Sequence, residues 1–416
     1  MSLLNAMYTG VSGLDAESDA LNVIGNNVAN ANTTGFKESR AVFEDAVNSA
    51  IGSSDPEGAG VQMTSTQQDF TQGTLESTGQ PTDLALSGNG FFVVSGSVDG
   101  QTGDFYTRNG QTTLNSNGTL VNPDGLALQG YAIQANGQMS SQLGPITLQT
   151  AALSPKATDT MTVTANLNSS SAQPTAAWDP QNPASTSNFS TSMTVYDSLG
   201  NGHNVSVYFA NTGNDTWQYY EIANGSEVQG GTAGQNVQIG SGTLTFNTSG
   251  ALQSVATTGG TVAFDGAKAQ TIDLDVGTPI ANGGTGLDGI TQFGSPSAVS
   301  AQSQDGYASG DLSGVQIGSD GTVSGVYSNG QTIAVGQLAI ATFGNNDGLS
   351  PTSGTLWAAT QQSGEPALGA AGSGGRGTVV SGSLEQSNVD IATQFVDLIA
   401  HQRGFEASSK TTSPRS

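Results

Sequence analysis

The sequence contains no cysteine, and this absence removes several kinds of site at once. No disulfide can form, and no metal centre built on thiolates can exist. The two histidines, His203 and His401, stand far apart in a turn and in a helical segment, where a structural role is the ordinary one. No phosphate-binding loop, His-Glu-x-x-His motif or EF-hand is present. The sequence therefore predicts no catalytic residues, no cofactor and no metal site.

Basic residues are scarce. The chain has 9 Lys and Arg against 33 Asp and Glu, which gives a formal net charge of −24 at pH 7. Between residues 41 and 375 the basic residues are Arg108, Lys156 and Lys268. A nucleic-acid-binding surface needs clustered cations to replace the counterions of the phosphates, so this composition argues against a nucleic-acid partner. It is typical of an acidic secreted or surface protein.

Long hydrophobic runs are also missing. No run of 18 apolar residues occurs, so we expect no membrane insertion. The start of the chain, Met-Ser-Leu-Leu-Asn-Ala, lacks the basic region and apolar core of a secretory signal, so we expect no cleaved signal peptide. The composition of an exported protein and the missing conventional signal therefore stand in tension.

Residues 344–348, Gly-Asn-Asn-Asp-Gly, could offer the oxygen atoms of Asn and Asp side chains to calcium. Asn, Asp and Gly are also the residues that tight turns use most. A turn rich in asparagine is therefore the favoured interpretation of this segment.

Both ends of the chain carry a helical pattern of apolar residues. Steps of three and four residues repeat through 4–28 and again through 384–405, a spacing typical of helices that pack through an apolar stripe. Asn388 or Asp390 can cap the second helix. A single helix pair buries only part of each stripe, so we expect the helices to order when copies of the chain associate. The predicted assembly core is Leu4, Met7, Val11, Leu14, Leu21, Ile24 and Val28 with Ile391, Phe395, Leu398, Ile399 and Phe405.

The chain between the helices has the pattern of β-structure. Glycine accounts for 58 residues, and charged residues make up only 10% of the chain. Turn pairs such as Asn201-Gly202 and Asn329-Gly330 separate short runs of β-branched and aromatic residues, which is typical of hairpins. We expect a mainly β, multi-domain body of sandwich-like or barrel-like domains, with the paired N- and C-terminal α-helices forming a coiled-coil-like core.

Two segments rich in small residues, 151–192 and 363–383, indicate joints between domains. They suggest that a central insertion divides an inner β domain into two chain segments. The predicted division is 1–30 with 384–416 as a helical core domain, 31–72 with 364–383 as a connecting region, 73–150 with 291–363 as an inner β domain, and 151–290 as an inserted outer β domain.

The segment VIGNNVANANTTGF, residues 23–36, ends the first helix with many turn-forming residues. Asn and Gly tolerate left-handed backbone, so the chain can leave the helix sharply here. Together with Leu384–Asp390 and Gln402-Arg403, this segment resembles the flagellar axial family of bacteria, which comprises rod, hook and hook-associated proteins. Segments 73–93 and 106–110 are similar to that family too. The matching motif residues are Asn26, Asn27, Asn30, Asn32, Gly35, Phe36, Asn388, Asp390, Gln402 and Arg403.

The length of the chain and its inserted domain are similar to the hook members of this family. The resemblance implies a structural subunit, not an enzyme, that polymerises with itself into a curved hollow tube and transmits motor torque as a universal joint. It implies terminal helices around a central channel and β domains outside them. The implied partners are the distal rod protein, the hook cap protein, the hook–filament junction protein and the flagellar type III export apparatus. The implied location is the extracellular hook of the flagellum.

Alternatives stay open. A distal rod or hook-associated member of the same family would form a straight tube or a cap-like ring. A secreted β-rich adhesin would be a stable monomer whose terminal helices are unnecessary for ligand binding. An enzyme is the least favoured class, because no catalytic constellation stands out.

The end of the chain departs from the family pattern. In that family the C-terminal helix usually continues well past the position of Lys410, whereas here Thr411–Ser416 follows. Proline has no backbone N–H and restricts the residue before it, so Ser413-Pro414 opposes further helix. We expect the second helix to end before this pair.

Overall fold

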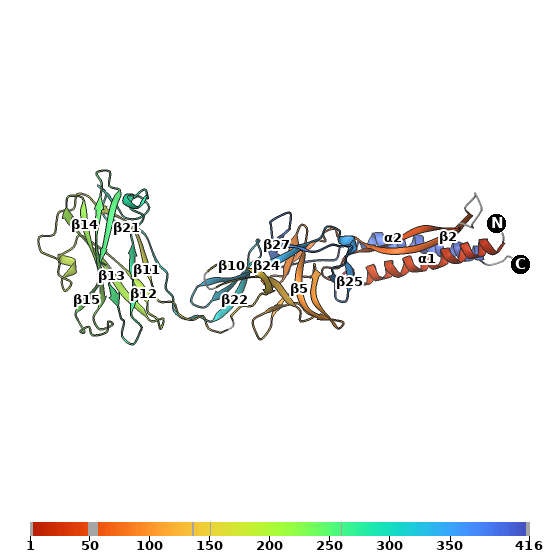
Figure 1. Cartoon of the computed structure of the whole chain (residues 1–416), viewed down its shortest axis with the longest axis horizontal. Coiled ribbons are helices and arrows are strands. Elements are labelled where there is room, and N and C mark those ends of the chain that lie inside the picture. The colour runs from red at the N-terminus through yellow and green to blue at the C-terminus, as the bar shows by residue number, and fades with distance from the viewer. Residues whose placement is uncertain (1–2, 49–56, 135–136, 150, 259, 413–416) are drawn as a thin grey trace. The chain divides into compact units, whose positions relative to one another are not determined.

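The computed structural model describes residues 3–48, 57–134, 137–149, 151–258 and 260–412. The chain forms two compact units, the first made of residues 1–150, 313–326 and 332–416 and the second of residues 151–312 and 327–331. Both long helices belong to the first unit, and both units are otherwise built of strands (Figure 1). The predicted fold class, a mainly β body with paired terminal helices, is confirmed.

The first unit contains two α-helices, a long hairpin and a 12-stranded sheet. The strands β22-β23-β24-β9-β5-β6-β26-β25 follow one another across the sheet, and two smaller strand pairs, β4–β28 and β3–β29, lie outside it. Its elements are α1 (Leu3–Ala29), β1 (Ser39–Asn48), β2 (Glu57–Gln68), β3 (Leu75–Ser77), β4 (Leu84–Ser87), β5 (Phe91–Val98), β6 (Gln101–Thr107), β7 (Thr113–Leu114), β8 (Leu120–Val121), β9 (Ala127–Ile133), β10 (Met139–Pro145), β22 (Leu312–Ile317), β23 (Thr322–Tyr327), β24 (Thr332–Thr342), the 3-10 turn η3 (Asn346–Gly348), β25 (Ser350–Thr352), β26 (Leu356–Ala358), β27 (Ala367–Ala370), β28 (Thr378–Ser381), β29 (Ser383–Glu385) and α2 (Ile391–Thr412).

An aromatic cluster connects the hairpin to the sheet of the first unit. Phe70 follows β2, and its ring centroid lies 5.5 Å from that of Phe91 and 5.6 Å from that of Trp357. The indole Nε1 of Trp357 donates to Oε1 of Gln68 over 2.6 Å. Edge-to-face aromatic packing adds to the apolar area that these side chains bury. The end of the hairpin is therefore fixed to the sheet.

The expected connecting regions contain regular structure. Residues 39–48 and 57–68 form the antiparallel strands β1 and β2, which lie along α1 (Figure 1). Gly60 approaches this helix so closely that a Cβ would lie 1.9 Å from Oγ of Ser12. Between 364 and 383, β27 pairs with β24 and β28 pairs with β4. The small residues of these segments permit close packing against the body, which composition alone does not distinguish from a linker.

The second unit is a β-sandwich. Its sheets have the orders β12-β13-β14-β15-β16 and β19-β11-β20, with β21 paired to β11. Along β11 every second residue is buried, and these residues share one core with the larger sheet. Its elements are β11 (Thr160–Asn168), η1 (Pro183–Ser185), β12 (Phe189–Tyr196), β13 (Gly202–Gly213), β14 (Thr216–Asn224), β15 (Asn236–Phe246), β16 (Leu252–Thr258), β17 (Thr261–Val262), β18 (Gln270–Thr271), β19 (Asp273–Asp275), η2 (Ile280–Asn282), β20 (Thr291–Phe293) and β21 (Ala298–Gln304).

The second unit extends beyond the expected insertion 151–290. Strand β20 pairs in parallel with β11, and β21 pairs with β11 in antiparallel fashion, so the chain leaves this unit only near Leu312. Residues 327–331 also belong to it. The boundary of this unit is set by pairing between strands that are distant in the sequence, and local composition does not reveal that pairing.

Glu221 is a buried carboxyl group inside the second unit. It lies on β14 opposite Gly240 of β15 and is 3% exposed. Burial, together with the nearby charge of Asp273, raises its pKa from 4.5 to about 7. The folded unit therefore favours the protonated, neutral form.

We expect Glu221→Gln to remove a pH dependence of stability. The folded pKa lies above the unfolded one, so the stability that Glu221 contributes is fully present below about pH 4.5 and is lost as pH rises through about 7. The loss is at most about 3 kcal/mol, at ~1.4 kcal/mol per pKa unit. Calorimetric unfolding of the full chain at pH 5 and pH 8 checks this. If the unchanged chain and the Glu221→Gln variant lose the same free energy of unfolding between pH 5 and pH 8, Glu221 does not cause the pH dependence.

Candidate functional site

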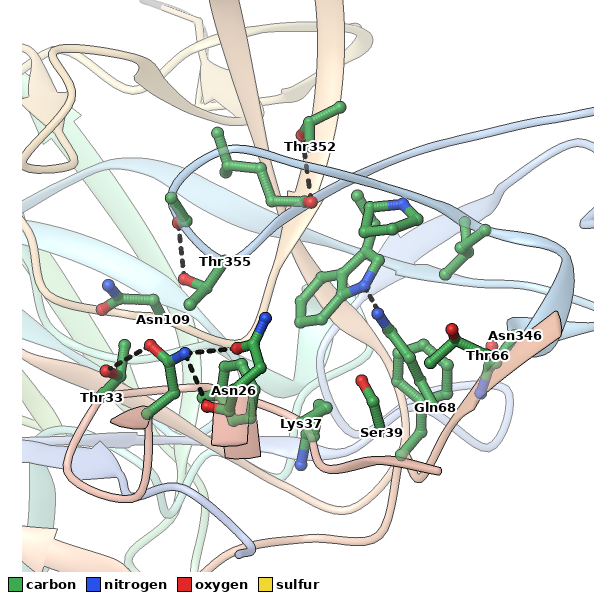
Figure 2. A pocket seen from close by; sticks show the side chains of 18 of the residues that line it. Asn26, Thr33, Lys37, Ser39, Thr66, Gln68, Asn109, Asn346, Thr352 and Thr355 are labelled. Atoms are coloured by element: carbon green, nitrogen blue, oxygen red, sulfur yellow. Dashed lines mark hydrogen bonds between the residues drawn. The ribbon is translucent and has the colours of Figure 1, made fainter. Parts of the chain in front are cut away.

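The end of α1 is shaped by asparagine side chains. The Asn30 side-chain nitrogen donates to the backbone oxygen of Asn26 at 3.0 Å and to its side-chain oxygen at 2.6 Å (Figure 2). The Thr33 hydroxyl donates to Oδ1 of Asn30 over 3.1 Å. The same Asn26 carbonyl also accepts the backbone N–H of Asn30 over 3.1 Å, so the Asn30 side chain reinforces the last turn of the helix. Asn32 is exposed and Phe36 is half-buried in the segment that follows.

Gly35 is required by its surroundings. Its φ is +70°, and its N–H donates to the backbone oxygen of Glu385 over 2.8 Å. A Cβ at this position would lie 2.5 Å from the backbone nitrogen of Asn109. Only glycine combines the left-handed backbone with so close an approach. The motif therefore brings the end of the first helix against the strand that precedes the second.

Beneath this contact lies a buried ionic cluster of Lys37, Arg108 and Glu385. The amine of Lys37 lies 2.6 Å from Oε1 of Glu385, and both side chains have no exposed surface. Nη1 of Arg108 lies 3.1 Å from Oε2 of the same carboxylate. The Lys37 amine also donates to the backbone oxygen of Thr71 over 2.5 Å, and Nη2 of Arg108 donates to that of Gly88 over 2.7 Å. The cluster joins segments from the beginning, the body and the end of the chain.

Two cations share one carboxylate in this cluster. Burial lowers the pKa of the Lys37 amine from its ordinary 10.5, while the charge of Glu385 and its hydrogen bond act in the opposite direction. Buried charges are tolerated only when they are paired and hydrogen-bonded. Glu385 is therefore the member on which the other two depend.

A second network of side chains, here named the root network, joins the end of α1 to the start of α2 and to β1. Asn27 donates to the backbone oxygen of Ser39 over 2.7 Å and to Oε1 of Gln394 over 3.0 Å. Its own oxygen accepts from the Ser39 N–H over 2.9 Å. Gln394 in turn donates to Oε1 of Glu38 over 2.8 Å. Asn27 and Gln394 are 1% and 2% exposed, so this network fixes α1, α2 and β1 relative to one another.

The start of α2 distinguishes the roles of the two candidate capping residues. Oδ1 of Asp390 accepts from the backbone N–H of Ala392 over 2.8 Å and of Thr393 over 3.3 Å, which is the geometry of an N-cap. Asn388 instead accepts from the N–H of Glu38 over 2.8 Å and donates to the backbone oxygen of Asp69 over 2.8 Å. It belongs to the root network. The helix continues to Thr412, and Ser413-Pro414 lies outside the described residues.

The seam between α1 and α2 consists mostly of small and polar residues. Gly13 faces Ser408, whose Oγ would lie 3.0 Å from a Cβ at that glycine. Nδ1 of His401 lies 2.6 Å from Oε2 of Glu17. Ala16 and Ala20 are buried on the same side of α1. The helices are antiparallel, because residues late in α1 contact residues early in α2.

Most of the predicted assembly core lies outside this seam. Ile24 is buried at 7% exposure, while Leu14, Leu21, Val28 and Leu398 are half-buried. The side chain of Leu4 lies outside the described residues. The exposed members are Met7, Val11, Ile391, Phe395, Ile399 and Phe405, and the neighbouring Tyr8 and Val396 are exposed with them. Gln402 and Arg403 are exposed on α2 as well. One molecule therefore leaves large apolar side chains uncovered in the first turns of α1 and along α2.

An open groove of about 730 Å³ lies beside the root of the helices. Asn26, Asn30 and Thr33 line it from the N-terminal motif, and Gln68 and Trp357 line it from the hairpin and the sheet (Figure 2). Its walls mix amides, hydroxyls and aromatic surface. No cluster of three or more metal-binding side chains occurs among the residues with described positions. Nor is any helix in the described ranges long and apolar enough to cross a membrane.

Both histidines contact carboxylates. Nδ1 of His203 lies 2.9 Å from Oε2 of Glu227, and its Nε2 lies 3.2 Å from Oδ2 of Asp197. Its ring stacks on Phe264 with the centroids 3.8 Å apart. The position of His203 inside the sandwich, like that of His401 in the helix seam, is that of a packing residue.

Sequence reasoning did not assign roles to Lys37, Arg108, Glu385 or Gln394. Lys37, Arg108 and Glu385 stand within motifs that resemble the family, yet no local pattern shows that they meet. The scarcity of basic residues was the one signal in the sequence that could have drawn attention to Lys37 and Arg108. Arg108 stands in a stretch nearly free of cations, and an arginine is rarely fully buried unless it is paired.

Four family models match successive parts of the chain. Their descriptions are "Flagella basal body rod protein" for residues 7–37, "Flagellar hook protein FlgE/F/G D1 domain" for 85–166, "Flagellar basal body protein FlaE D2 domain" for 166–307 and "Flagellar basal body rod FlgEFG protein C-terminal" for 380–413. These matches, at both terminal helices and in both β units, define a flagellar axial protein of the rod and hook class.

Comparison with whole proteins identifies the family within that class. The chain is 38% identical to the flagellar hook protein FlgE of Escherichia coli K12 over 98% of this chain and 96% of that one. It is 39% identical to the Salmonella typhimurium protein of that name, over 96% and 95%, and 33% identical to that of Treponema pallidum, over 98% and 96%. The chain belongs to the flagellar hook protein FlgE family, and its role is that of a structural subunit of the hook.

A solved structure shows the same fold. The Helicobacter pylori flagellar hook protein FlgE2 aligns with 75% of this chain and 100% of its own, with a TM-score of 0.54 and 16% identity. At that identity the likeness concerns the fold alone.

Proposed function

We propose that this hook subunit polymerises with further copies of itself through the outward faces of α1 and α2. The observation that carries the proposal is the row of exposed apolar side chains on these faces. Phe395, Val396 and Ile399 are each at least half exposed, and Tyr8 and Val11 are exposed on the first helix. Monomeric proteins rarely leave such a contiguous apolar surface uncovered. Packing of neighbouring helix pairs would bury it.

The two faces of each helix differ in their contacts, and this difference supports the proposal. The small, polar seam and the root network fix the pair inside one molecule, so the apolar stripes are free for neighbours. The product is a curved hollow tube with the helices around its channel and the β units outside, acting as a universal joint that transmits torque. The role is structural and not catalytic. The root network fixes the base of the pair in one molecule, and we infer that the rest of the two helices orders as assembly buries their apolar stripes.

Further partners belong to the same proposal. The ends of the tube would contact the distal rod protein, the hook cap protein and the hook–filament junction protein. Delivery to the extracellular hook would use the flagellar type III export apparatus. The groove beside the helix root is available for contacts with neighbouring subunits.

Electron microscopy of the purified chain tests the proposal. The net charge of −24 opposes association, so raised salt and protein concentration should promote tubes. A variant that lacks residues 1–20 and 399–416 should remain monomeric. It keeps Asn27, Gln394 and the buried ionic cluster, so the β body stays folded. Curved tubes indicate a hook, and straight tubes a rod-like assembly. Tubes from the shortened chain, or a full chain that stays monomeric, would overturn the proposal.

A further inference from the structure

The unpaired charges on the two helices face opposite ways. In the seam, Glu17 and His401 point toward each other. Two residues along an α-helix turn a side chain through about 200°. Asp15 and Asp19, each two residues from Glu17, therefore point away from the seam on α1. Arg403, two residues from His401, points away from it on α2. All three side chains are exposed.

These charges also lie at one level along the helix pair. The antiparallel pairing sets Gly13 beside Ser408, Glu17 beside His401 and Asn27 beside Gln394. Arg403 lies between His401 and Ser408, so it stands level with the turn of α1 that contains Asp15 and Asp19. At this height α1 therefore carries Asp15 and Asp19 on its outer side, and α2 carries Arg403, with Glu406 one turn further along the same face.

Arg403 has no carboxylate within ion-pair distance among the described residues, although acidic residues greatly outnumber basic ones in this chain. Of the other basic residues, Lys37 and Arg108 are buried against Glu385, Lys156 pairs with Asp305, and Arg40 donates to Oε1 of Gln67. Lys268 and Lys410, like Arg403, form no ion pair with a described carboxylate. Arg376 donates to backbone oxygens of Ala367 and Leu368. A free arginine beside exposed apolar residues is available to a partner that carries acidic groups.

We propose that Arg403 of one copy pairs with Asp15 and Asp19 of the next, and that this contact sets the lateral register of the assembled helix pairs. The proposal rests on the assembly function proposed above and names the partner groups. The contact is head-to-tail, with different surfaces on its two sides, and such contacts generate rings or helical arrays. The apolar stripes supply the burial, and the charges select the alignment.

Charge reversal tests this pairing. We expect Arg403→Asp to raise the protein concentration needed for assembly by roughly tenfold or more, because like charges would meet at the contact. Asp15→Arg with Asp19→Arg should act similarly. The chain that combines all three substitutions should assemble at a protein concentration within about threefold of that of the unchanged chain, because the swapped ion pairs form again. The combined chain still carries the Arg403→Asp change, so its rescue cannot come from a restored helix propensity at that position. Sedimentation measures the protein concentration needed for assembly, and electron microscopy shows whether tubes form.

Lys268→Asp is the matched control, since it changes the net charge equally at an exposed site in the second unit. It should alter assembly less than threefold, as expected for a charge that takes no part in the helix contact. Normal assembly of Arg403→Asp, or failure of the swapped chain to recover, would overturn the pairing. A parent chain that never assembles overturns the proposed function instead, so the two failures are distinguishable.

Discussion

Replacing Glu385 with alanine should destabilise the first unit by about 3–5 kcal/mol, the range for breaking a buried ion pair on one side. The carboxylate is fully buried and neutralises both Lys37 and Arg108. Its Oε1 also accepts the Gly73 N–H over 3.0 Å. Without Glu385, two cations and a backbone donor remain inside the protein with too few partners. Hydrogen exchange of peptides from β4 and β28 in the full chain measures the loss.

Glu76→Ala is the control for this change. Glu76 lies on β3, directly opposite Leu384, and its exposed carboxylate accepts from the side-chain amide of Gln386 over 2.8 Å. An exposed hydrogen bond of this kind should cost less than about 1 kcal/mol. Adding Lys37→Met to the Glu385 variant should recover part of the loss, because one unpaired cation is removed. Equal effects at Glu385 and Glu76 would contradict the importance of the buried cluster.

Replacing Ile399 with aspartate should abolish tube formation and leave the monomer folded. Ile399 is 50% exposed, so the substitution should change monomer stability by less than about 0.5 kcal/mol. In the assembled tube the same position would be covered by a neighbouring helix. Burial of an unpaired carboxylate there costs several kcal/mol for every subunit. Electron microscopy gives the assembly result, and circular dichroism of the monomer confirms its fold.

Two further variants separate charge from polarity. Ile399→Asn introduces no charge and should also block assembly, because an amide would be buried without a partner. Ile399→Leu keeps the apolar surface and should assemble. Tubes from the aspartate variant at the parent's concentration would show that this face of α2 stays exposed, which contradicts the proposed packing.

Local patterns were enough to locate the helices and many turns. The three–four spacing placed the first helix through Val28, and α1 ends at Ala29. The Asp390 cap was among the two predicted, and α2 begins at the next residue. Asn201-Gly202 and Asn329-Gly330 lie where β12 meets β13 and where β23 meets β24. Each of these features depends on residues close together in the chain, so the sequence carries the necessary information.

The sequence by itself thus determined the helix–β–helix order, the turn chemistry of the N-terminal motif and the apolar stripes of both helices. Only the tertiary structure decided which face of each helix the molecule covers itself. Periodicity shows that a stripe exists, but a stripe can be buried within one molecule or between copies. Here Asn27 and Gln394 select a small, polar seam, and Phe395 and Ile399 stay outside it.

The meeting of Lys37, Arg108 and Glu385 was likewise decided by the fold. These residues are separated by up to 348 positions, and each looks ordinary in its own segment. A buried ion pair depends on which segments the topology brings together and on how far water is excluded there. Neither quantity follows from residues that are close together in the chain, so this buried ionic cluster emerged only in the tertiary structure.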